Sequence, residues 1–309
     1  MSILVHVTSP FVGAQLAALR RLAPEQTICT DDDACDAGAV EAILAFRLPP
    51  GVVERYPRLR FVAAAGAGVD EMLASTTLPE DVPVTRAHDP MQAVRMAQYV
   101  ALCVLRWHRE LPRFERQQAR REWQRVASER ESAWTVGLMG YGALGRAVAA
   151  SLASFGYPLR IWTRTRHDVS GIASFAGPGE LAAFASGTRV LVCLLPLTAT
   201  TKRLVSRALL DALPRGAYVV NVSRGAIVDE AALIAGLDAG HIAGASLDVF
   251  QQEPLPPESP LWRDARILVT PHIAAMPDPE TAARQLLDNL ARARRGEPLL
   301  HTVDRSRGY

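Results

Sequence analysis

The stretch that decides the fold reads TVGLMGYGALGRAVA and spans residues 135–149. Its first third is apolar and β-branched and predicts a buried strand, and its last third predicts a helix. Gly140, Gly142 and Gly145 form a GxGxxG motif between the two, where a tight turn, a close approach to pyrophosphate and close helix–strand packing need glycine. The motif therefore predicts a dinucleotide site at the helix N-terminus. The loop residues expected at the cofactor are Gly140, Gly142, Ala143, Leu144 and Gly145.

The end of the second predicted strand indicates which dinucleotide binds. NAD-binding folds place a carboxylate there, about 20 residues beyond the glycines, to bind the ribose 2′-OH. Here residues 163–166 read TRTR, and no carboxylate precedes Asp168. Two arginines and two hydroxyls can bind a 2′-phosphate that a carboxylate would repel, so we expect NADP(H) to be preferred over NAD(H). The residues expected around the ribose are Thr163, Arg164, Thr165 and Arg166.

Short apolar runs alternate with amphipathic helical patterns along the rest of the chain. This alternation is typical of doubly wound parallel sheets of the α/β class. The 309 residues suit two domains of roughly 150 residues each. Strands are expected at residues 3–7, 42–46, 60–64, 135–139, 159–163, 190–194, 218–221, 243–247 and 267–270, and helices at 10–22, 90–108, 144–155, 230–239 and 279–295.

Composition excludes several classes of protein. A net charge of +2 implies no bulk attraction to nucleic acid or to a membrane surface. Lys202 is the only lysine and follows no glycine loop, which excludes Walker-A nucleotide hydrolases and pyridoxal-phosphate enzymes. No apolar stretch reaches the ~18 residues of a membrane span. The four cysteines show no CxxC spacing and no paired framework, so we expect a soluble protein in the reducing cytoplasm.

Three later segments each end a predicted strand with a polar residue: Arg224, Glu253 and His272. Ligands of open α/β sheets bind outside the carboxyl ends of the strands, so these side chains can converge. Hydride addition to a 2-keto acid needs a proton donor for the developing alkoxide, a cation for the carboxylate and carbonyl, and a group that orients the donor. His272 with Glu253 meets the first and third needs, and Arg224 meets the second.

The segments RGAIVD, DVFQQEPLP and TPHIAA resemble the signatures of the D-isomer-specific 2-hydroxyacid dehydrogenases. More narrowly, PLRIWTRTR resembles the glyoxylate/hydroxypyruvate reductase A type of that family. The resemblance implies metal-free, NADPH-dependent reduction of glyoxylate and hydroxypyruvate, with His272 as proton donor, Glu253 as its partner and Arg224 on the substrate carboxylate and keto oxygen. Further implied contacts are Ala67, Gly68 and Val69 with the carboxylate, Ser223 and Asp248 near the nicotinamide, and Leu195 and Pro196 beside the adenosine.

The resemblance also implies how the chain is divided. A Rossmann-type cofactor domain at residues 105–276 would be inserted in a flavodoxin-like substrate domain made of residues 1–104 and 277–309. A homodimer would form through a charged arm at residues 109–123. Arg47 stands where the reductase A type carries Trp, which leaves the identity of the keto acid open.

Two alternatives remain beside this interpretation. The first is an NAD(H)-dependent dehydrogenase of a larger D-2-hydroxy acid, against which the missing acid after Trp162 argues. The second is a dinucleotide-sensing regulator without catalysis, against which the intact set of Arg224, Glu253 and His272 argues. A nucleic-acid-binding module built on the basic arm ranks below both, because three glutamates lie among its basic residues.

Overall fold

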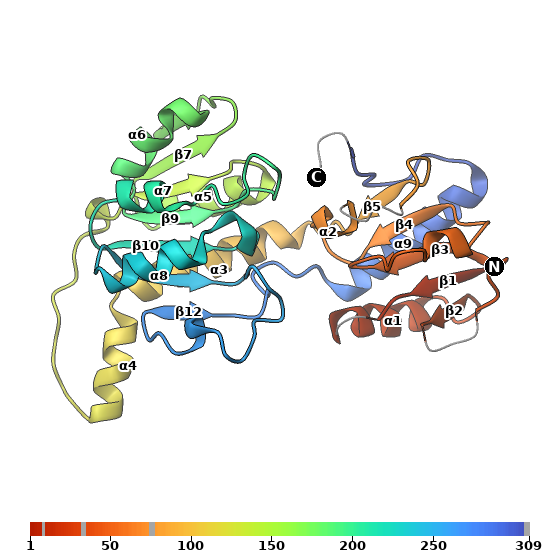
Figure 1. Cartoon of the computed structure of the whole chain (residues 1–309), viewed down its shortest axis with the longest axis horizontal. Helices are drawn as coiled ribbons and strands as arrows, with labels where there is room; N and C mark the ends of the chain where they lie inside the picture. Colours follow the sequence, from red (N-terminus) through yellow and green to blue (C-terminus); the bar gives the residue numbers. More distant parts are fainter. Residues whose placement is uncertain (8–9, 32–34, 74–77, 306–309) are drawn as a thin grey trace. The chain divides into compact units, whose positions relative to one another are not determined.

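The computed structural model describes residues 1–7, 10–31, 35–73 and 78–305. The chain forms two compact units, one made of Met1–Gln92 with Met276–Tyr309 and the other of Ala93–Ala275. Each unit is built on its own parallel sheet with helices packed on it (Figure 1). The expected pair of doubly wound α/β domains, one inserted in the other, is confirmed.

The unit Ala93–Ala275 contains a seven-stranded sheet in the order β12-β11-β10-β9-β6-β7-β8, with every neighbouring pair parallel. When the strands are numbered from β6, this is the Rossmann strand order. The chain first adds β7 and β8 on one side of β6 and then continues on the other side with β9, so the strand order reverses between β6 and β9. Ligands of such sheets bind at that reversal, outside the carboxyl ends of the strands. The strands are β6 (Val136–Met139), β7 (Leu159–Thr163), β8 (Ile172–Ala176), β9 (Val190–Cys193), β10 (Ala217–Asn221), β11 (Ile242–Leu247) and β12 (Ile267–Val269).

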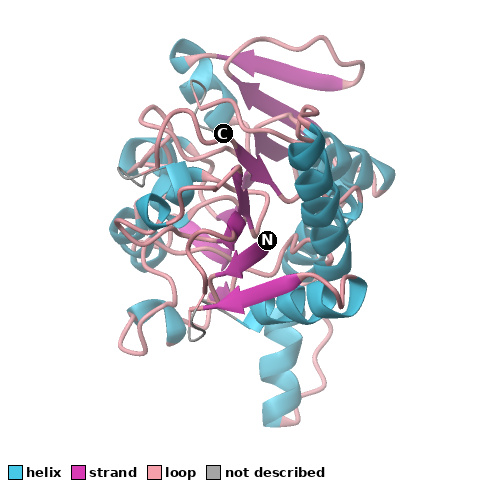
Figure 2. Ribbon diagram, turned by 90° about the vertical axis from the view of Figure 1, so that its right-hand side faces the viewer, coloured by secondary structure: helices cyan, strands magenta, loops and turns pink. Residues whose placement is uncertain are grey.

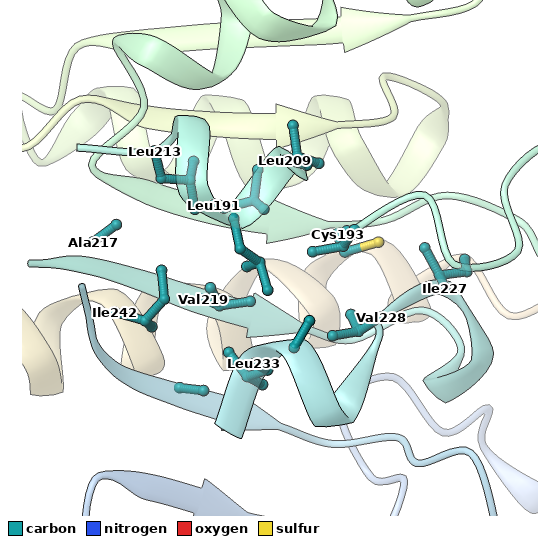
Figure 3. Packing of buried hydrophobic residues seen from close by; sticks show 14 of the residues in the cluster. Leu191, Cys193, Leu209, Leu213, Ala217, Val219, Ile227, Val228, Leu233 and Ile242 are labelled. Carbon is teal, nitrogen blue, oxygen red and sulfur yellow. The ribbon is translucent and has the colours of Figure 1, made fainter. Parts of the chain in front are cut away.

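Helices cover both faces of this sheet and bury its strands on both sides. On one face, side chains of α3 (Met91–His108) and α5 (Ala143–Ser154) pack against the strands. On the other face lie α6 (Leu181–Ser186), α7 (Arg207–Ala212) and α8 (Glu230–Asp238). Figure 3 shows Leu191, Cys193 and Val219 of the sheet packed together with leucines of these helices. Burial of this kind stabilises the fold by about 25 cal/mol per Å² of apolar surface.

The boundary between the units differs from the expected one. The expected division between residues 104 and 105 falls inside α3, whereas the structure divides the chain after Gln92. Met96, Val100 and Val104 of α3 are buried in the same cluster as Val148 of α5. The helix therefore packs with the seven-stranded sheet along most of its length.

The unit Met1–Gln92 with Met276–Tyr309 contains a five-stranded parallel sheet in the order β2-β1-β3-β4-β5, which is the flavodoxin-like order. Side chains of α1 and α9 pack together on one face, where Leu19 and Leu286 are buried beside Ile3. The elements are β1 (Ser2–Val5), α1 (Pro10–Leu22), β2 (Thr27–Thr30), β3 (Val40–Ala45), β4 (Phe61–Ala64), α2 (Asp70–Leu73), β5 (Val84–Arg86) and α9 (Pro279–Arg295).

The charged arm extends beyond the seven-stranded sheet of its own unit. It begins with α4 (Leu111–Arg120) and continues through a segment in which the Trp123 side chain is 94% exposed. Figures 1 and 2 show α4 extending away from the rest of its unit. None of the described helices is long and apolar enough to cross a membrane. Short 3-10 turns lie at Val53–Arg55, Glu131–Ala133, Pro178–Glu180, Gly225–Ile227 and Pro260–Trp262.

The cysteines differ from expectation at one pair. Cys29 and Cys35 form a disulfide with their Cα atoms 5.9 Å apart, so the prediction that the cysteines are unpaired is wrong for these two. The spacing of the two residues along the chain alone did not indicate this bond. Cys103 and Cys193 are free thiols buried in the other unit.

Candidate active site

The glycine loop follows β6 directly and leads into α5, as the sequence predicts. Gly140 has a φ of +110°, and a Cβ there would lie 3.0 Å from the Leu194 carbonyl oxygen. A Cβ at Gly145 would lie 2.3 Å from the Gly140 carbonyl oxygen. Gly142 is the N-cap of α5, and a Cβ there would meet no protein atom. Packing therefore requires the first and third glycines, whereas the second leaves open space that a bound pyrophosphate can use.

Further residues that the sequence predicts at the nucleotide site lie next to this loop. Ala143 and Leu144 form the first turn of α5, where backbone N–H groups have no partner within the helix. Leu195 and Pro196 follow β9, across the reversal point of the sheet. The Leu194 N–H donates to the Met139 carbonyl oxygen at 2.9 Å, which holds the two loops side by side.

The two arginines of the TRTR segment, which follows β7, lie in different environments. The buried Thr163 hydroxyl donates to the Thr165 carbonyl oxygen at 2.6 Å and shapes the turn. The Arg166 guanidinium donates to the Ser174 carbonyl oxygen and forms an ion pair with Glu180. The Arg164 side chain is exposed and makes no hydrogen bond or ion pair with any residue the structure describes. Arg164 is therefore the arginine that is available to a phosphate.

A close approach of two loops positions Arg224. Gly225, directly after it, passes so near the Phe250 backbone that a Cβ there would lie 1.8 Å from the Phe250 carbonyl carbon. The buried Asn221 holds the turn, since its amide donates to the Arg224 carbonyl oxygen at 3.1 Å. The Ser223 hydroxyl donates to Asn221 Oδ1 at 2.9 Å and lies buried, so Ser223 shapes this turn.

Glu253 and His272 form a hydrogen-bonded pair. The His272 Nδ1 lies 2.8 Å from Glu253 Oε2, and the other carboxylate oxygen accepts the Phe250 N–H at 3.0 Å. Burial opposes ionisation of Glu253, but the hydrogen bond and charge of His272 and the charge of Arg224 bring its pKa below the ordinary value. This carboxylate therefore stays ionised at neutral pH, and both other predicted residues act on it electrostatically.

His272 has a φ of +56°, which is uncommon for a residue other than glycine. Asp248 holds this turn: its carboxylate accepts the Ile273 and Ala274 N–H groups, both at 2.9 Å. Its backbone oxygen accepts the His272 N–H at 2.8 Å. Backbone strain of this kind persists where the surroundings over-determine it, and it often accompanies function. Asp248 is 1% exposed, which places it beneath the His272 turn.

Sequence reasoning missed a buried polar network behind this turn. The Thr270 hydroxyl donates to Asp248 Oδ1 at 2.6 Å, and the Tyr99 hydroxyl lies 2.5 Å from Thr270 Oγ1. Burial raises the pKa of Asp248 above its ordinary value, and hydrogen bonds from Thr270 and from the two backbone N–H groups oppose that shift. Asn221 was missed as well, although its place at the end of a buried strand, one turn before Arg224, was a usable signal.

The segment at 66–69 lies in the other unit, after β4. Val69 is buried, while Gly68 is exposed and Ala67 is half-buried. A Cβ at Gly66 would lie 2.9 Å from Phe46 Cε1, so this glycine is needed for the ring to pack. Arg47, the next residue in the sequence after Phe46, pairs with Glu71 through hydrogen bonds of 2.5 and 2.7 Å.

Comparison with known proteins identifies relatives of this chain. Residues 101–274 match the model of the D-isomer specific 2-hydroxyacid dehydrogenase, NAD binding domain. The chain is 42% identical over 266 residues to the glyoxylate/hydroxypyruvate reductase A of Salmonella heidelberg (strain SL476), covering 84% of this chain and 85% of the relative.

Solved structures agree across the whole chain. A D-isomer specific 2-hydroxyacid dehydrogenase from Xanthobacter autotrophicus Py2, in complex with NADPH and MES, has a TM-score of 0.88 at 42% identity and covers 100% of this chain and 99% of its own. An NADPH-dependent glyoxylate/hydroxypyruvate reductase from Sinorhizobium meliloti, in complex with NADP and sulfate, has a TM-score of 0.90 at 32% identity and covers 100% of both chains. The chain belongs to the D-isomer specific 2-hydroxyacid dehydrogenase family.

Proposed function

We propose that this chain is an NADPH-dependent reductase of small 2-keto acids that converts glyoxylate to glycolate and hydroxypyruvate to D-glycerate. The observation that carries the proposal is the His272–Glu253 pair, on which the charge of Arg224 also acts. Relatives named as glyoxylate/hydroxypyruvate reductases support the substrate class. In this proposal the unit Ala93–Ala275 binds the cofactor and the other unit contributes Ala67, Gly68 and Val69 to binding of the substrate carboxylate.

Arg224 and His272 have different roles in the reduction of the keto acid: Arg224 binds it and His272 donates a proton. The guanidinium presents a planar fork of N–H donors that suits a carboxylate and a keto oxygen. It also stabilises negative charge as it develops on that oxygen. Glu253 engages His272 Nδ1, which leaves Nε2 as the nitrogen that passes a proton to the alkoxide. Ser223 and Asp248 support the two turns that carry these side chains.

The residues present fit NADPH. The glycine loop provides open space at Gly142 and the N-terminus of α5, which suit a pyrophosphate, and Arg164 provides an uncommitted cation for the 2′-phosphate. Bound NADPH supplies the hydride that reduces C2 of the keto acid. Thr163, Thr165, Leu195 and Pro196 line the route between these two contacts in the proposal.

Replacing Arg164 by alanine is expected to raise the KM for NADPH by about 10-fold or more and to leave the KM for NADH nearly unchanged. The reason is that the NADH ribose offers no phosphate for the charge-assisted bond, which contributes about 1.5–3 kcal/mol. Arg166→Ala is the matched control, because that guanidinium already pairs with Glu180. Steady-state kinetics with each cofactor measures both effects. An equal rise of KM for both cofactors would show that Arg164 does not bind the 2′-phosphate.

The proposed activity is tested by following the absorbance of NADPH and of NADH with glyoxylate, hydroxypyruvate and phenylpyruvate in turn. Fast turnover of the two small acids with NADPH supports the proposal. Preference for NADH would contradict the role of Arg164 but leave the reaction class standing. Preference for phenylpyruvate would indicate a dehydrogenase of larger acids. Tight cofactor binding with no turnover would favour the dinucleotide-sensing regulator.

We also propose that two copies of this chain associate through the arm of α4 and Trp123. A Trp side chain that is 94% exposed is uncommon on a free surface and is typical of interfaces. Replacing Trp123 by glutamate is expected to shift the molecule from dimer to monomer, because it places a charge where apolar area would be buried. Light scattering coupled to size exclusion measures the mass. Trp262→Glu, at a half-exposed Trp outside the arm, is the control and should stay dimeric.

The cytoplasmic location stays a prediction. The free buried thiols Cys103 and Cys193 favour a reducing compartment, and the Cys29–Cys35 disulfide argues for an oxidising one. Mass spectrometry of the protein alkylated in intact cells would decide between them by showing whether Cys29 and Cys35 are labelled.

A further inference from the structure

Three basic side chains gather at the carboxyl end of β5, outside the site described above. Arg86 is the last residue of β5, His88 follows two residues later, and His301 belongs to the C-terminal segment. The rings of His88 and His301 stack with their centroids 4.3 Å apart and their planes at 26°. Two segments that are far apart in the sequence therefore bring three basic groups together.

Backbone contacts hold these three positions. The C-terminal segment runs beside β5, with Thr85 and Thr302 forming an antiparallel bridge (Figure 1). The Arg86 N–H donates to the His301 carbonyl oxygen at 3.1 Å. Gln285 of α9 binds the segment at residues 86–88. Its side-chain amide donates to the Arg86 carbonyl oxygen at 2.6 Å, and its side-chain oxygen accepts the His88 N–H at 2.9 Å. The arrangement is fixed by elements of a single unit.

Among the described residues, no acidic side chain forms an ion pair with Arg86, His88 or His301. The Arg86 guanidinium is half-buried and has no hydrogen-bond or ion-pair partner in the part of the chain that the structure describes. Burial lowers the pKa of Arg86, and burial together with the charges of His88 and Arg86 lowers the pKa of His301. The nearby Asp89 uses both carboxylate oxygens to accept backbone N–H groups. A partly desolvated cation without a partner is costly, and an anionic ligand would remove that cost.

We propose that Arg86, His88 and His301 bind a doubly charged oxyanion with the chemistry of a phosphate group. The guanidinium fork matches two phosphate oxygens, and the imidazoles add N–H donors. The Ala87 N–H donates to the Gly66 carbonyl oxygen at 3.0 Å, which joins this site to the segment at 66–69. The oxyanion is either a free phosphate ion or, because the site adjoins the segment proposed to bind the keto acid, a phosphate group carried by a 2-keto acid.

Titration of the full chain with inorganic phosphate tests the site. Calorimetry gives the affinity, and the imidazole C–H resonances in NMR report binding at His88 and His301. Arg86→Gln is expected to weaken phosphate binding by at least about 10-fold, since a charge-assisted contact is lost. Arg58→Gln removes the same charge from an exposed position of the same unit and should leave the affinity unchanged. Equal weakening by both variants, or no effect of Arg86→Gln, would overturn the proposal.

Two further variants separate loss of phosphate binding at this site from misfolding and from binding at the catalytic site. His88 is exposed, so His88→Gln carries the test if Arg86→Gln does not fold. Arg224→Gln is expected to retain phosphate binding, and loss of binding in this variant together with retention in Arg86→Gln would contradict the proposal. Kinetics then identify the source. A free ion leaves Arg86→Gln as active as the wild type on every keto acid, whereas a substrate-borne phosphate lowers kcat/KM in this variant for the phosphorylated keto acid alone.

Discussion

Replacing His272 by alanine is expected to lower kcat for glyoxylate by about 100- to 10,000-fold, the range that a positioned proton donor contributes. The alkoxide then has to take its proton from water, because no other group in this turn replaces Nε2. NADPH binding should change by less than about 2-fold, since His272 lies after β12 and the glycine loop after β6. Steady-state turnover and fluorescence titration with NADPH measure the two quantities separately.

Glu253→Gln is the companion variant. It keeps a side chain of the same size beside His272 Nδ1 but removes the charge, so we expect a smaller loss of kcat than in His272→Ala. Because the pKa of Glu253 is held below its ordinary value by its basic neighbours, the wild-type carboxylate is already ionised at neutral pH. Loss of NADPH binding in parallel with kcat would show that His272 supports the fold of the turn and is not the proton donor.

Replacing Arg224 by glutamine is expected to lower kcat/KM for glyoxylate by about 100-fold or more, through both a higher KM and a lower kcat. A paired, charge-assisted contact to the carboxylate is lost, and such losses amount to about 2–5 kcal/mol. The pKa of Glu253 should rise in this variant, since the charge of Arg224 is one of the causes that lower it. Kinetics over a range of glyoxylate concentrations separates KM from kcat.

Two further variants separate the contributions of Arg224. Arg224→Lys keeps the positive charge but lacks the planar guanidinium, so it should retain more activity than Arg224→Gln and less than the wild type. Arg207→Gln, at an exposed arginine of α7 paired with Asp211, should behave as the wild type. A full recovery by lysine would mean that charge alone is needed, and an unchanged KM in Arg224→Gln would contradict a contact with the substrate carboxylate.

Much of the fold was predictable because its signals are local. The helices at residues 10–22 and 279–295 and the strand at 159–163 agree with the structure at both ends. Each combines a periodic apolar pattern with a clear start or stop, such as the Asp278 N-cap whose carboxylate accepts the Thr281 N–H at 2.7 Å. Three strands, β2, β5 and β8, were missed. They are short and lie at sheet edges, or are half-buried, so their apolar patterns are weak.

For the candidate site, the sequence by itself determined the glycine loop and predicted Arg224, Glu253 and His272, because each follows a strand whose end the pattern marks. Only the tertiary structure decided which partners these groups have. It assigned Arg166 to Glu180 and left Arg164 available, buried Asp248 beneath the His272 turn, placed α3 in the core of the cofactor unit and joined Cys29 to Cys35. The physical reason is that hydrogen bonds, ion pairs and burial depend on contacts that form only when the packed chain brings side chains together, and residue types and spacing along the chain do not encode those distances.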